Sequence, residues 1–359
     1  MSNENWLGQI DASKHLYELV IPGSHDAGVY RDTSVVGAHK DISVKESLVK
    51  PEWVRCQSSS IYNQAMAGSR FFDCRVYLRS FPVKKYVNGK LVKEQQVPTL
   101  GHFFRDTKSG QGGGYGGSLA TVINDAISFV RGHTSEFLIL RFSHTKCPDQ
   151  VANVLEEIYD NNGADQYILT GDVNIAQARL ASVRGKVIMI FDSKFNKQRL
   201  QTYSEKPKWY QRGVKQKQGR GLAAKGMHLF TKYTAGKPPG NGLCTCGAFA
   251  NTGDMAKVEK KSLEAVKAHR DHGSENDHLC FVYWQMTGGN VEQKAKSDTG
   301  THAKMQDFLY DCMKACGNAL PNVISHDFVC EESCNPIIRL NTERKAMMSE
   351  VLARELKRT

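Results

Sequence analysis

Short apolar runs alternate with segments of helical periodicity along most of the chain. Seven runs are rich in branched and aromatic side chains and have the length of buried strands. They cover residues 19–23, 70–78, 97–103, 137–142, 186–191, 279–286 and 323–329, and a weaker eighth run covers residues 227–233. These runs are the predicted strands.

Apolar residues recur at intervals of three and four between the strands, which is typical of helices with one face packed on a core. The predicted helices cover residues 61–67, 119–130, 151–158, 255–269, 303–315 and 342–356. The alternation predicts an α/β fold, namely a single TIM-type β/α barrel that is distorted or incomplete. With neither an internal repeat nor a linker, residues 1–359 are expected to form one domain.

Two glycine-containing segments interrupt the pattern. Asn88-Gly89 predicts a tight turn in a hairpin. The run Gly110-Gln-Gly-Gly-Gly-Tyr-Gly-Gly117 lacks the Gly-Lys-Ser/Thr ending of a phosphate-binding loop. We interpret it as a mobile loop and expect no bound nucleotide.

The positive charge of the chain is concentrated in one segment. The formal net charge is +11, and twelve Lys and Arg face one acidic residue, Glu205, between Lys194 and Lys237. This excess equals the net charge of the whole chain, so we define residues 194–238 as the basic insert.

Aromatic residues accompany the charge: Trp209 and Tyr210 lie within the stretch from Lys206 to Lys217. This mixture is typical of contact with an anionic membrane surface. A solvated, partly disordered loop is the alternative. A nucleic-acid partner is not expected, since no recognised motif accompanies the charge.

Composition restricts the cellular setting. No apolar run approaches a membrane span, and the first residues lack a secretory signal. The ten cysteines include no Cys-x-x-Cys pair and do not have the density of a disulfide scaffold. We expect a monomer with reduced thiols, cytoplasmic or exported without a classical signal peptide, and peripheral at membranes.

Polar residues with catalytic chemistry accompany three predicted strands. The first strand leads through Pro22-Gly23-Ser24 into His25 and Asp26. Asp73 and Arg75 are two residues apart and share one face of their strand, and the next strand ends at His102. In a β/α barrel, side chains at strand ends carry the chemistry, and imidazole is the side chain that titrates near neutrality.

The order of these motifs resembles the X domain of phosphatidylinositol-specific phospholipase C, in particular its bacterial, metal-independent branch. The resembling stretches cover nearly the whole chain but thin out between about residues 194 and 279. They are residues 19–28, 68–76, 97–103, 135–140, 184–188 and 323–328.

The resemblance implies a reaction and a role for each polar residue. The inositol 2-hydroxyl attacks phosphorus, diacylglycerol leaves, and a cyclic phosphate remains. His25 is then the general base, oriented by Asp327, and His102 is the general acid. Asp26 would raise the pKa of His102, and Arg75 would hold the phosphate.

The expected headgroup contacts match the family pattern less completely than the catalytic residues do. Asp73, Arg184 and Asp192 are the expected substrate-binding residues, although Arg184 could equally be a turn residue before its strand. Relatives often carry Lys and Glu after the fourth strand, where this chain has Ser143 and Thr145. The resemblance therefore indicates the reaction type more closely than the headgroup.

Neither a metal nor another cofactor is expected. In the calcium-dependent branch an acidic ligand occupies the position of Arg75, and a permanent cation there would repel calcium. His269, His272, His278 and Cys280 follow no familiar ligand spacing, so we interpret them as a solvated surface.

The sequence thus predicts a metal-independent phosphodiesterase of the phospholipase C type, acting at a membrane surface. Two alternatives remain: a phosphodiesterase for another lipid or glycerophosphodiester, and a non-catalytic module that binds anionic lipid. The presence of both histidines argues against the second, because a pure binding module needs neither.

Overall fold

A computed structural model describes most of the chain. The described residues are 2–30, 50–87, 90–106, 110–143, 145, 148–192, 226–234, 240–271, 276–316 and 320–356. Most of the basic insert, including Trp209 and Tyr210, lies outside them, as do Asn88-Gly89, His144 and His272.

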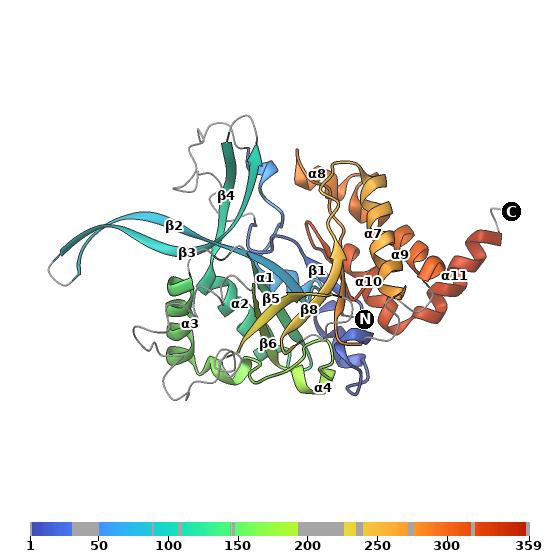
Figure 1. The fold of residues 1–359 in the computed structure, drawn as a ribbon, viewed down its shortest axis with the longest axis horizontal. Coiled ribbons are helices and arrows are strands. Elements are labelled where there is room, and N and C mark those ends of the chain that lie inside the picture. Colours follow the sequence, from blue (N-terminus) through green and yellow to red (C-terminus); the bar gives the residue numbers. More distant parts are fainter. Residues whose placement is uncertain are drawn as a thin grey trace.

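Eight parallel strands form a closed barrel (Figure 1). In spatial order they are β1 (Ile21–Ser24), β2 (Phe71–Val87), β5 (Phe137–Ser143), β6 (Lys186–Phe191), β7 (Met227–Lys232), β8 (Leu243–Ala248), β9 (Leu279–Tyr283) and β10 (Val323–His326). The first strand closes the ring, because Gly23 pairs with Phe71 of β2 on one side and Ser325 of β10 on the other. The TIM-type prediction is confirmed, and the ring is complete rather than open.

One predicted barrel strand lies outside the ring. Residues 97–103 belong to β3 (Lys90–Asp106), which pairs antiparallel with β2 and with β4 (Gly110–Ser118). β2 and β3 continue beyond the barrel as a long twisted arm (Figure 1). Val87 pairs with Lys90, as the predicted hairpin requires.

The glycine run that we interpreted as a mobile loop is strand β4 (Gly110–Ser118), so that interpretation is wrong. Glycine is needed there because other backbone approaches closely. A Cβ on Gly113 would lie 2.2 Å from the carbonyl oxygen of His102, and one on Gly116 would lie 1.9 Å from that of Gly28. The apolar pattern did not indicate this strand, because glycine contributes no apolar side chain.

One strand of the ring, β8 (Leu243–Ala248), was not predicted from the apolar pattern. Its sequence Leu-Cys-Thr-Cys-Gly-Ala is short and only partly apolar. Parallel pairing with β7 and β9 on both sides stabilises it nonetheless.

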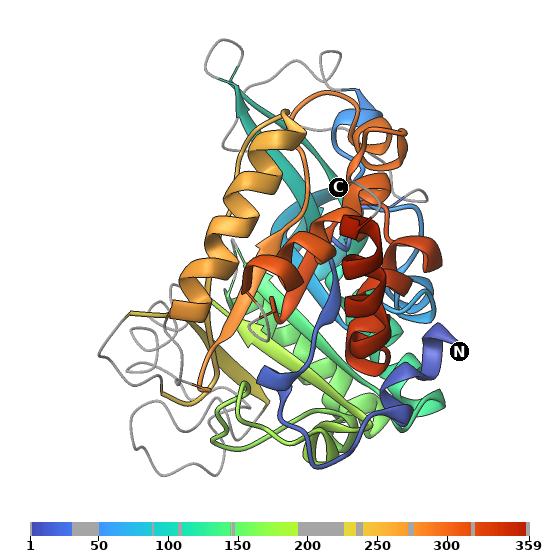
Figure 2. The ribbon, with the colours of Figure 1, turned by 90° about the vertical axis from the view of Figure 1, so that its right-hand side faces the viewer.

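Helices cover the outside of the barrel in two groups. α1 (Ile61–Met66), α2 (Leu119–Gly132), α3 (Pro148–Asn162) and α4 (Leu180–Val183) precede β6 in the chain. α7 (Met255–Asp271), α8 (Val291–Lys296), α9 (Thr301–Cys316), α10 (Glu331–Thr342) and α11 (Arg344–Leu356) follow β8 (Figure 2). Pro336 lies inside α10, which explains why periodicity did not predict that helix.

Each barrel strand contributes side chains to two hydrophobic cores, one inside the ring and one outside it. Side chains such as Ile139, Ile188 and Phe281 fill the inside of the ring. Their neighbours Leu138, Val187 and Val282 point outward against the helices. This alternation explains the continuous apolar runs in the sequence, since both faces of a parallel barrel strand are buried.

A buried ion pair lies near the N-terminal end of the barrel. Arg70 and Glu136 are fully buried and 2.7 Å apart (Nη2 to Oε2). Arg70 also donates to the carbonyl oxygens of Asn3 and Glu4, and Glu136 accepts the backbone N–H of Gly8. The pair therefore fixes the N-terminal segment beneath the barrel, with its polar atoms satisfied.

In the described part of the chain, no helix combines the length and the apolar character that crossing a bilayer would require.

Candidate active site

The candidate site lies at the C-terminal end of the barrel, where β1 and β10 end and β2 continues into the arm. β1 leads into His25 and Asp26, and β10 leads into Asp327. Asp26 and Phe328 both have positive φ, +42° and +52°, so the chain turns sharply directly after each strand. These turns aim side chains that are 302 positions apart at each other.

His25 and Asp327 form a buried pair. His25 Nδ1 lies 2.8 Å from Asp327 Oδ1, and the two residues are 6% and 3% exposed. An Nδ1–H that donates to the carboxylate leaves Nε2 as the free basic atom. The predicted orienting role of Asp327 therefore has the required geometry.

Two opposite charges flank His25 Nε2. Arg75 Nη2 lies 3.0 Å away and Asp26 Oδ2 lies 3.2 Å away. The guanidinium can donate to the lone pair of a neutral imidazole, whereas Asp26 can accept the N–H of a protonated one. Both states of the ring thus have a partner, which suits an atom that gains a proton during a reaction.

Burial disfavours the charged form of His25, but the carboxylates of Asp26 and Asp327 outweigh it. The pKa of His25 is raised from its ordinary value as a result.

His102 approaches the same carboxylate from β3. Its Nδ1 lies 3.0 Å from the carbonyl oxygen of Val54 and 3.7 Å from Asp26 Oδ2. The ring centres of His25 and His102 are 6.1 Å apart. The structure thus brings both predicted histidines to one site.

The direction of the His102 pKa differs from our expectation. Asp26 raises it, as predicted, but burial is the larger effect and the positive charges of Arg75 and His25 act in the same direction. The pKa of His102 is therefore lowered in the free protein. A bound anion beside the ring would oppose this shift.

Arg75 connects the parts of the site. Its Nε lies 2.8 Å from Asp26 Oδ1 and 3.7 Å from Asp73 Oδ2. These carboxylates outweigh the effect of burial and raise its pKa, so the guanidinium stays charged. The residue is a fixed cation with its side chain partly open to solvent.

Cys56 was not predicted at the site. Its thiol lies 3.2 Å from His102 Nδ1 and 3.9 Å from Asp26 Oδ2. Such a Cys–His contact could indicate a nucleophile. However, burial and the neighbouring carboxylates raise the pKa of Cys56 well above its ordinary value, so it remains an unreactive thiol.

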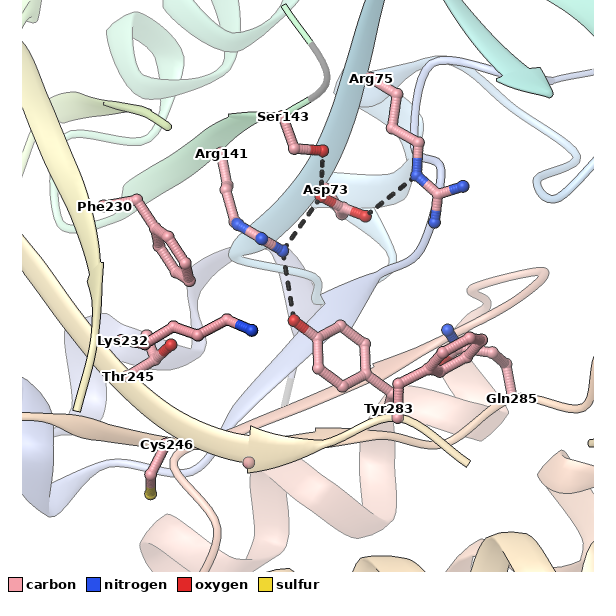
Figure 3. A pocket seen from close by; sticks show the side chains of 12 residues that line it. Asp73, Arg75, Arg141, Ser143, Phe230, Lys232, Thr245, Cys246, Tyr283 and Gln285 are labelled. Carbon is pink, nitrogen blue, oxygen red and sulfur yellow. Dashed lines mark hydrogen bonds and ion pairs between the residues drawn. The ribbon is translucent and has the colours of Figure 1, made fainter. Parts of the chain in front are cut away.

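Two cavities meet at Arg75. The larger, of about 400 Å³, contains the histidines and an apolar wall that includes Trp53, Phe103 and Phe249. The smaller, of about 270 Å³, is lined mainly by polar residues and is formed by β2, β5, β7, β8 and β9 (Figure 3). Arg75, Phe249 and Gln285 line both.

The smaller cavity contains a polar network that the sequence only partly indicated. Arg141 lies 3.4 Å from Asp73 Oδ1 and 3.2 Å from the hydroxyl of Tyr283 (Figure 3). Ser143 also contacts Asp73, and the side chain of Lys232 extends into the same cavity. Lys232 and Tyr283 were missed because no motif marks them; only the barrel brings their strands to Asp73.

The remaining predicted residues lie in different places. Asp192 directly follows β6, at the same end of the barrel as His25. Arg184 precedes β6, at the opposite end, and its guanidinium donates to the carbonyl oxygens of Leu7 and Ile10. Arg184 therefore cannot contact a headgroup at this site, and that prediction is wrong. Thr145 is buried.

Several buried polar side chains hold the site without lining it. Gln57 donates to the carbonyl oxygens of His25 and His326 and accepts the N–H of Val329. It thereby ties the loop after β1 to the loop after β10. His326 points to the other side of its strand and contacts Ser333, as the strand alternation predicts.

Some side chains at the site have the spacing of metal ligands, for example His25, Asp26 and Asp73. Arg75 contacts all three of these residues. Because its permanent charge lies among the carboxylates, a cation binding there would meet electrostatic repulsion.

Asp26→Asn should lower the pKa of both histidines, because its negative charge opposes the effect of burial at each ring. NMR titration of the imidazole signals measures both values. Asp254→Asn, at an exposed position before α7, is the control and should leave them unchanged. If Asp26→Asn shifts neither ring, the carboxylate does not have this role.

The chain is similar to known proteins in sequence and in structure. No family model matches the chain. A 1-phosphatidylinositol phosphodiesterase of Staphylococcus aureus (strain Newman) is 24% identical over 193 residues, covering 52% of this chain and 50% of that protein. A PI-PLC X-box domain-containing protein of Dictyostelium discoideum is 25% identical over 166 residues, covering 43% of this chain and 19% of that protein.

Solved structures match over nearly the full length. The phosphatidylinositol-specific phospholipase C of Listeria monocytogenes has a TM-score of 0.56 at 15% identity, covering 96% of this chain and all of that one. The S. aureus phospholipase has a TM-score of 0.54 at 18% identity, with 94% and 97% covered. The chain spans about half the length of the curated S. aureus relatives that it matches in sequence. It therefore has the barrel fold of the bacterial phosphatidylinositol-specific phospholipases C, and about half of the chain is similar in sequence to the S. aureus 1-phosphatidylinositol phosphodiesterase.

Proposed function

We propose that this protein is a phosphodiesterase of the phospholipase C type that cleaves phosphatidylinositol or a related phospholipid. The observation that carries the proposal is the arrangement of two histidines, His25 buried and His102 partly buried, about one buried carboxylate, with Arg75 between two cavities. General acid–base cleavage of a phosphodiester needs these groups: a base, an acid and a fixed positive charge. The curated relatives named above support the substrate class.

The base step follows from the contacts of His25. A substrate hydroxyl would displace Arg75 from Nε2 and transfer its proton there as it attacks phosphorus. Asp327 stabilises the resulting imidazolium through Nδ1–H, and Asp26 accepts the new Nε2–H. Arg75, once displaced, is free to hold two phosphate oxygens.

In the acid step, His102 protonates the oxygen of the leaving group. The bond from phosphorus to the glycerol oxygen breaks, and His102 donates a proton to that oxygen, which leaves diacylglycerol and a cyclic phosphate. His102 must first be protonated, and its lowered pKa disfavours this in the free protein. The negative charge of the bound phosphodiester favours the imidazolium, so substrate binding itself prepares the acid.

The two cavities suggest the orientation of the substrate. The polar cavity, with Asp73, Arg141 and Tyr283, suits the hydroxyls of an inositol ring. The cavity with Trp53 and Phe249 suits the lipid side of the bond. Asp192 remains a candidate headgroup residue, and neither a metal nor another cofactor takes part in these steps.

A phosphodiesterase acting on a different headgroup is the second candidate. Arg141 and Lys232 bring two cations to the polar cavity where relatives often use Lys and Glu. A headgroup with more negative charge than plain inositol would suit them.

We further propose that the protein acts as a peripheral protein at membranes, in the cytoplasm or after export. The basic insert, with Trp209 and Tyr210 among Lys206–Lys217, would provide the anionic-surface contact. Phe249 is 38% exposed at the rim of both cavities, which adds an apolar contact near the site. A monomer suffices for these contacts.

Replacing His25 or His102 with Ala should reduce cleavage about 10²-fold or more, because each removes one proton transfer. ³¹P NMR with phosphatidylinositol vesicles measures cleavage as a cyclic phosphodiester signal. A substrate with a better leaving group should rescue His102→Ala but not His25→Ala, and equal rescue would contradict the assigned roles. His133→Ala, on the outside of the barrel, is the control and should cleave normally.

The pH–rate profile of the unmodified protein tests the same pair. The base must be neutral and the acid charged, so activity rises with pH through one coupled pKa and falls through the other. In the free protein the pKa of His102 is lowered and that of His25 is raised, so the acid limb of kcat/KM follows His102. The bound phosphodiester raises the pKa of His102, so the acid limb should lie at higher pH in kcat than in kcat/KM. Acid limbs at the same pH would count against substrate-assisted protonation.

Arg75→Lys should lose about 10²-fold in rate, because an ammonium cannot grip two phosphate oxygens at once. Arg79→Lys on the same strand is the control and should cost little. Cleavage by the unmodified protein should persist in EGTA, a calcium-selective chelator. If EGTA abolishes the activity and calcium restores it, Arg75 does not replace a metal.

Replacing Lys206, Lys208, Arg212, Lys215 and Lys217 together with Gln should weaken binding to anionic vesicles. Each residue contributes about 1 kcal/mol at a charged bilayer before screening by salt. Hydrolysis of a soluble, short-chain substrate should be spared. Gln at Lys257, Lys260, Lys261 and Lys267 of α7 is the charge control, and equal loss in both variants would refute a specific contact.

A further inference from the structure

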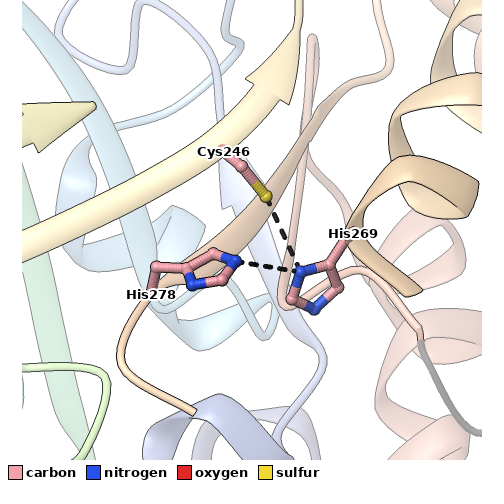
Figure 4. A group of neighbouring side chains, drawn as sticks. All are labelled: Cys246, His269 and His278. Atoms are coloured by element: carbon pink, nitrogen blue, oxygen red, sulfur yellow. Dashed lines mark hydrogen bonds between the residues drawn. The ribbon is translucent and has the colours of Figure 1, made fainter. Parts of the chain in front are cut away.

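A second cluster of reactive side chains lies on the outer face of the barrel. Cys246 of β8, His269 of α7 and His278, directly before β9, converge between the barrel wall and α7 (Figure 4). They come from three separate elements, and no adjacent motif in the sequence indicates the set. Our interpretation of His278 and Cys280 as solvated surface residues is wrong, since they are 1% and 0% exposed.

The cluster lies on the other side of β8 from the candidate active site. Cys246 lines the polar cavity together with Thr245 and Gly247, but its sulfur points away from that cavity (Figure 3). It packs instead with the outer core beside α7. The proposed phosphodiester cleavage uses none of these side chains.

The two distances from His269 Nδ1 to the other ligand atoms match those around a tetrahedral zinc ion. Bond lengths of about 2.0–2.1 Å to nitrogen and 2.3 Å to sulfur imply about 3.3 Å between two nitrogens and about 3.6 Å between nitrogen and sulfur. His269 Nδ1 lies 3.2 Å from His278 Nε2 and 3.7 Å from Cys246 Sγ. All three ligand atoms lie within 4.8 Å of one another.

The neighbours of the cluster prepare it for a cation. His278 Nδ1 lies 3.0 Å from Asp277 Oδ1, an arrangement that leaves Nε2 as the ligand atom. Metal-binding histidines are typically oriented by such a carboxylate. The ring of Tyr233 stacks on His278 with the centres 4.1 Å apart, which fixes the plane of the imidazole.

The position of the sulfur is fixed by strand pairing. Cys246 of β8 is the register partner of Cys280 of β9, so the sulfur is held by the barrel wall and His269 is supplied by α7. Cysteine binds a metal ion as the thiolate, and binding releases the proton.

We propose that Cys246, His269 and His278 bind one zinc-type ion that fastens α7 to the wall formed by β8 and β9. Water takes the fourth position, because Cys246 and His269 are partly exposed. Asp277 is a positioning residue that orients His278. The soft thiolate and the imidazoles favour zinc over calcium or magnesium.

Cobalt(II) is the probe, added to the full-length protein after metal removal. We expect one equivalent to bind with a tetrahedral spectrum and a thiolate-to-cobalt charge-transfer band, and one equivalent of zinc to displace it. Zinc should also raise the Tm of the metal-free protein. Absence of the thiolate band, or of any stoichiometric binding by the unmodified protein, would overturn the proposal without reference to a variant.

Variants locate the ion. Cys246→Ser and His269→Gln should each weaken zinc binding at least 100-fold and remove the Tm gain, and Asp277→Asn should weaken binding about 10–100-fold. Cys244→Ser is the matched control, a buried thiol on the same strand that is outside the cluster, and should bind as the unmodified protein does. Equal affinity of the Cys246 and Cys244 variants would refute the site. Circular dichroism checks that each variant is folded.

Discussion

The closure of the barrel by β1 is the constraint on which the rest of the structure depends. This strand of four residues is fully buried and pairs with β2 on one side and β10 on the other. The register sets Ser24 beside His326, so the residues that follow each strand, His25 and Asp327, meet at 2.8 Å. A shift by one residue would turn every side chain of β1 to the other face and break this contact.

Asp26 sets the electrostatics of the site. It is 1% exposed and lies within 2.8–3.7 Å of Arg75, His25 and His102, so one buried carboxylate balances three basic groups. A buried charge must be paired, and here the pairs belong to the reactive groups themselves. The opposite pKa directions of the two histidines follow from their different shares of negative charge: His25 has Asp327 in addition.

The two faces of β8 have different roles. One face contributes Thr245 to the polar cavity, and the other directs the Cys246 sulfur toward α7. Strand alternation makes this separation possible, because neighbouring side chains point to opposite sides of the wall. The proposed ion would therefore stabilise the position of the wall without contacting substrate.

The sequence alone determined the features that depend on local order. Continuous apolar runs that alternate with helices indicated the barrel. The runs are continuous because both faces of each barrel strand are buried. The contiguous motifs around His25, Asp73 and His102 marked most of the candidate site. Features that depend on distant pairing were not visible: β8 is stabilised by its neighbours, and β4 by close backbone approach.

Only the tertiary structure decided which polar residues meet. Arg184 lies at the N-terminal end of the barrel although it is close in sequence to a site strand, whereas Lys232 and Tyr283 reach the polar cavity from strands without a motif. The lowered pKa of His102 likewise depends on burial and on charges brought from other elements. A motif specifies residue types along one strand, but the closed ring determines which strands are neighbours and how deeply each side chain is buried.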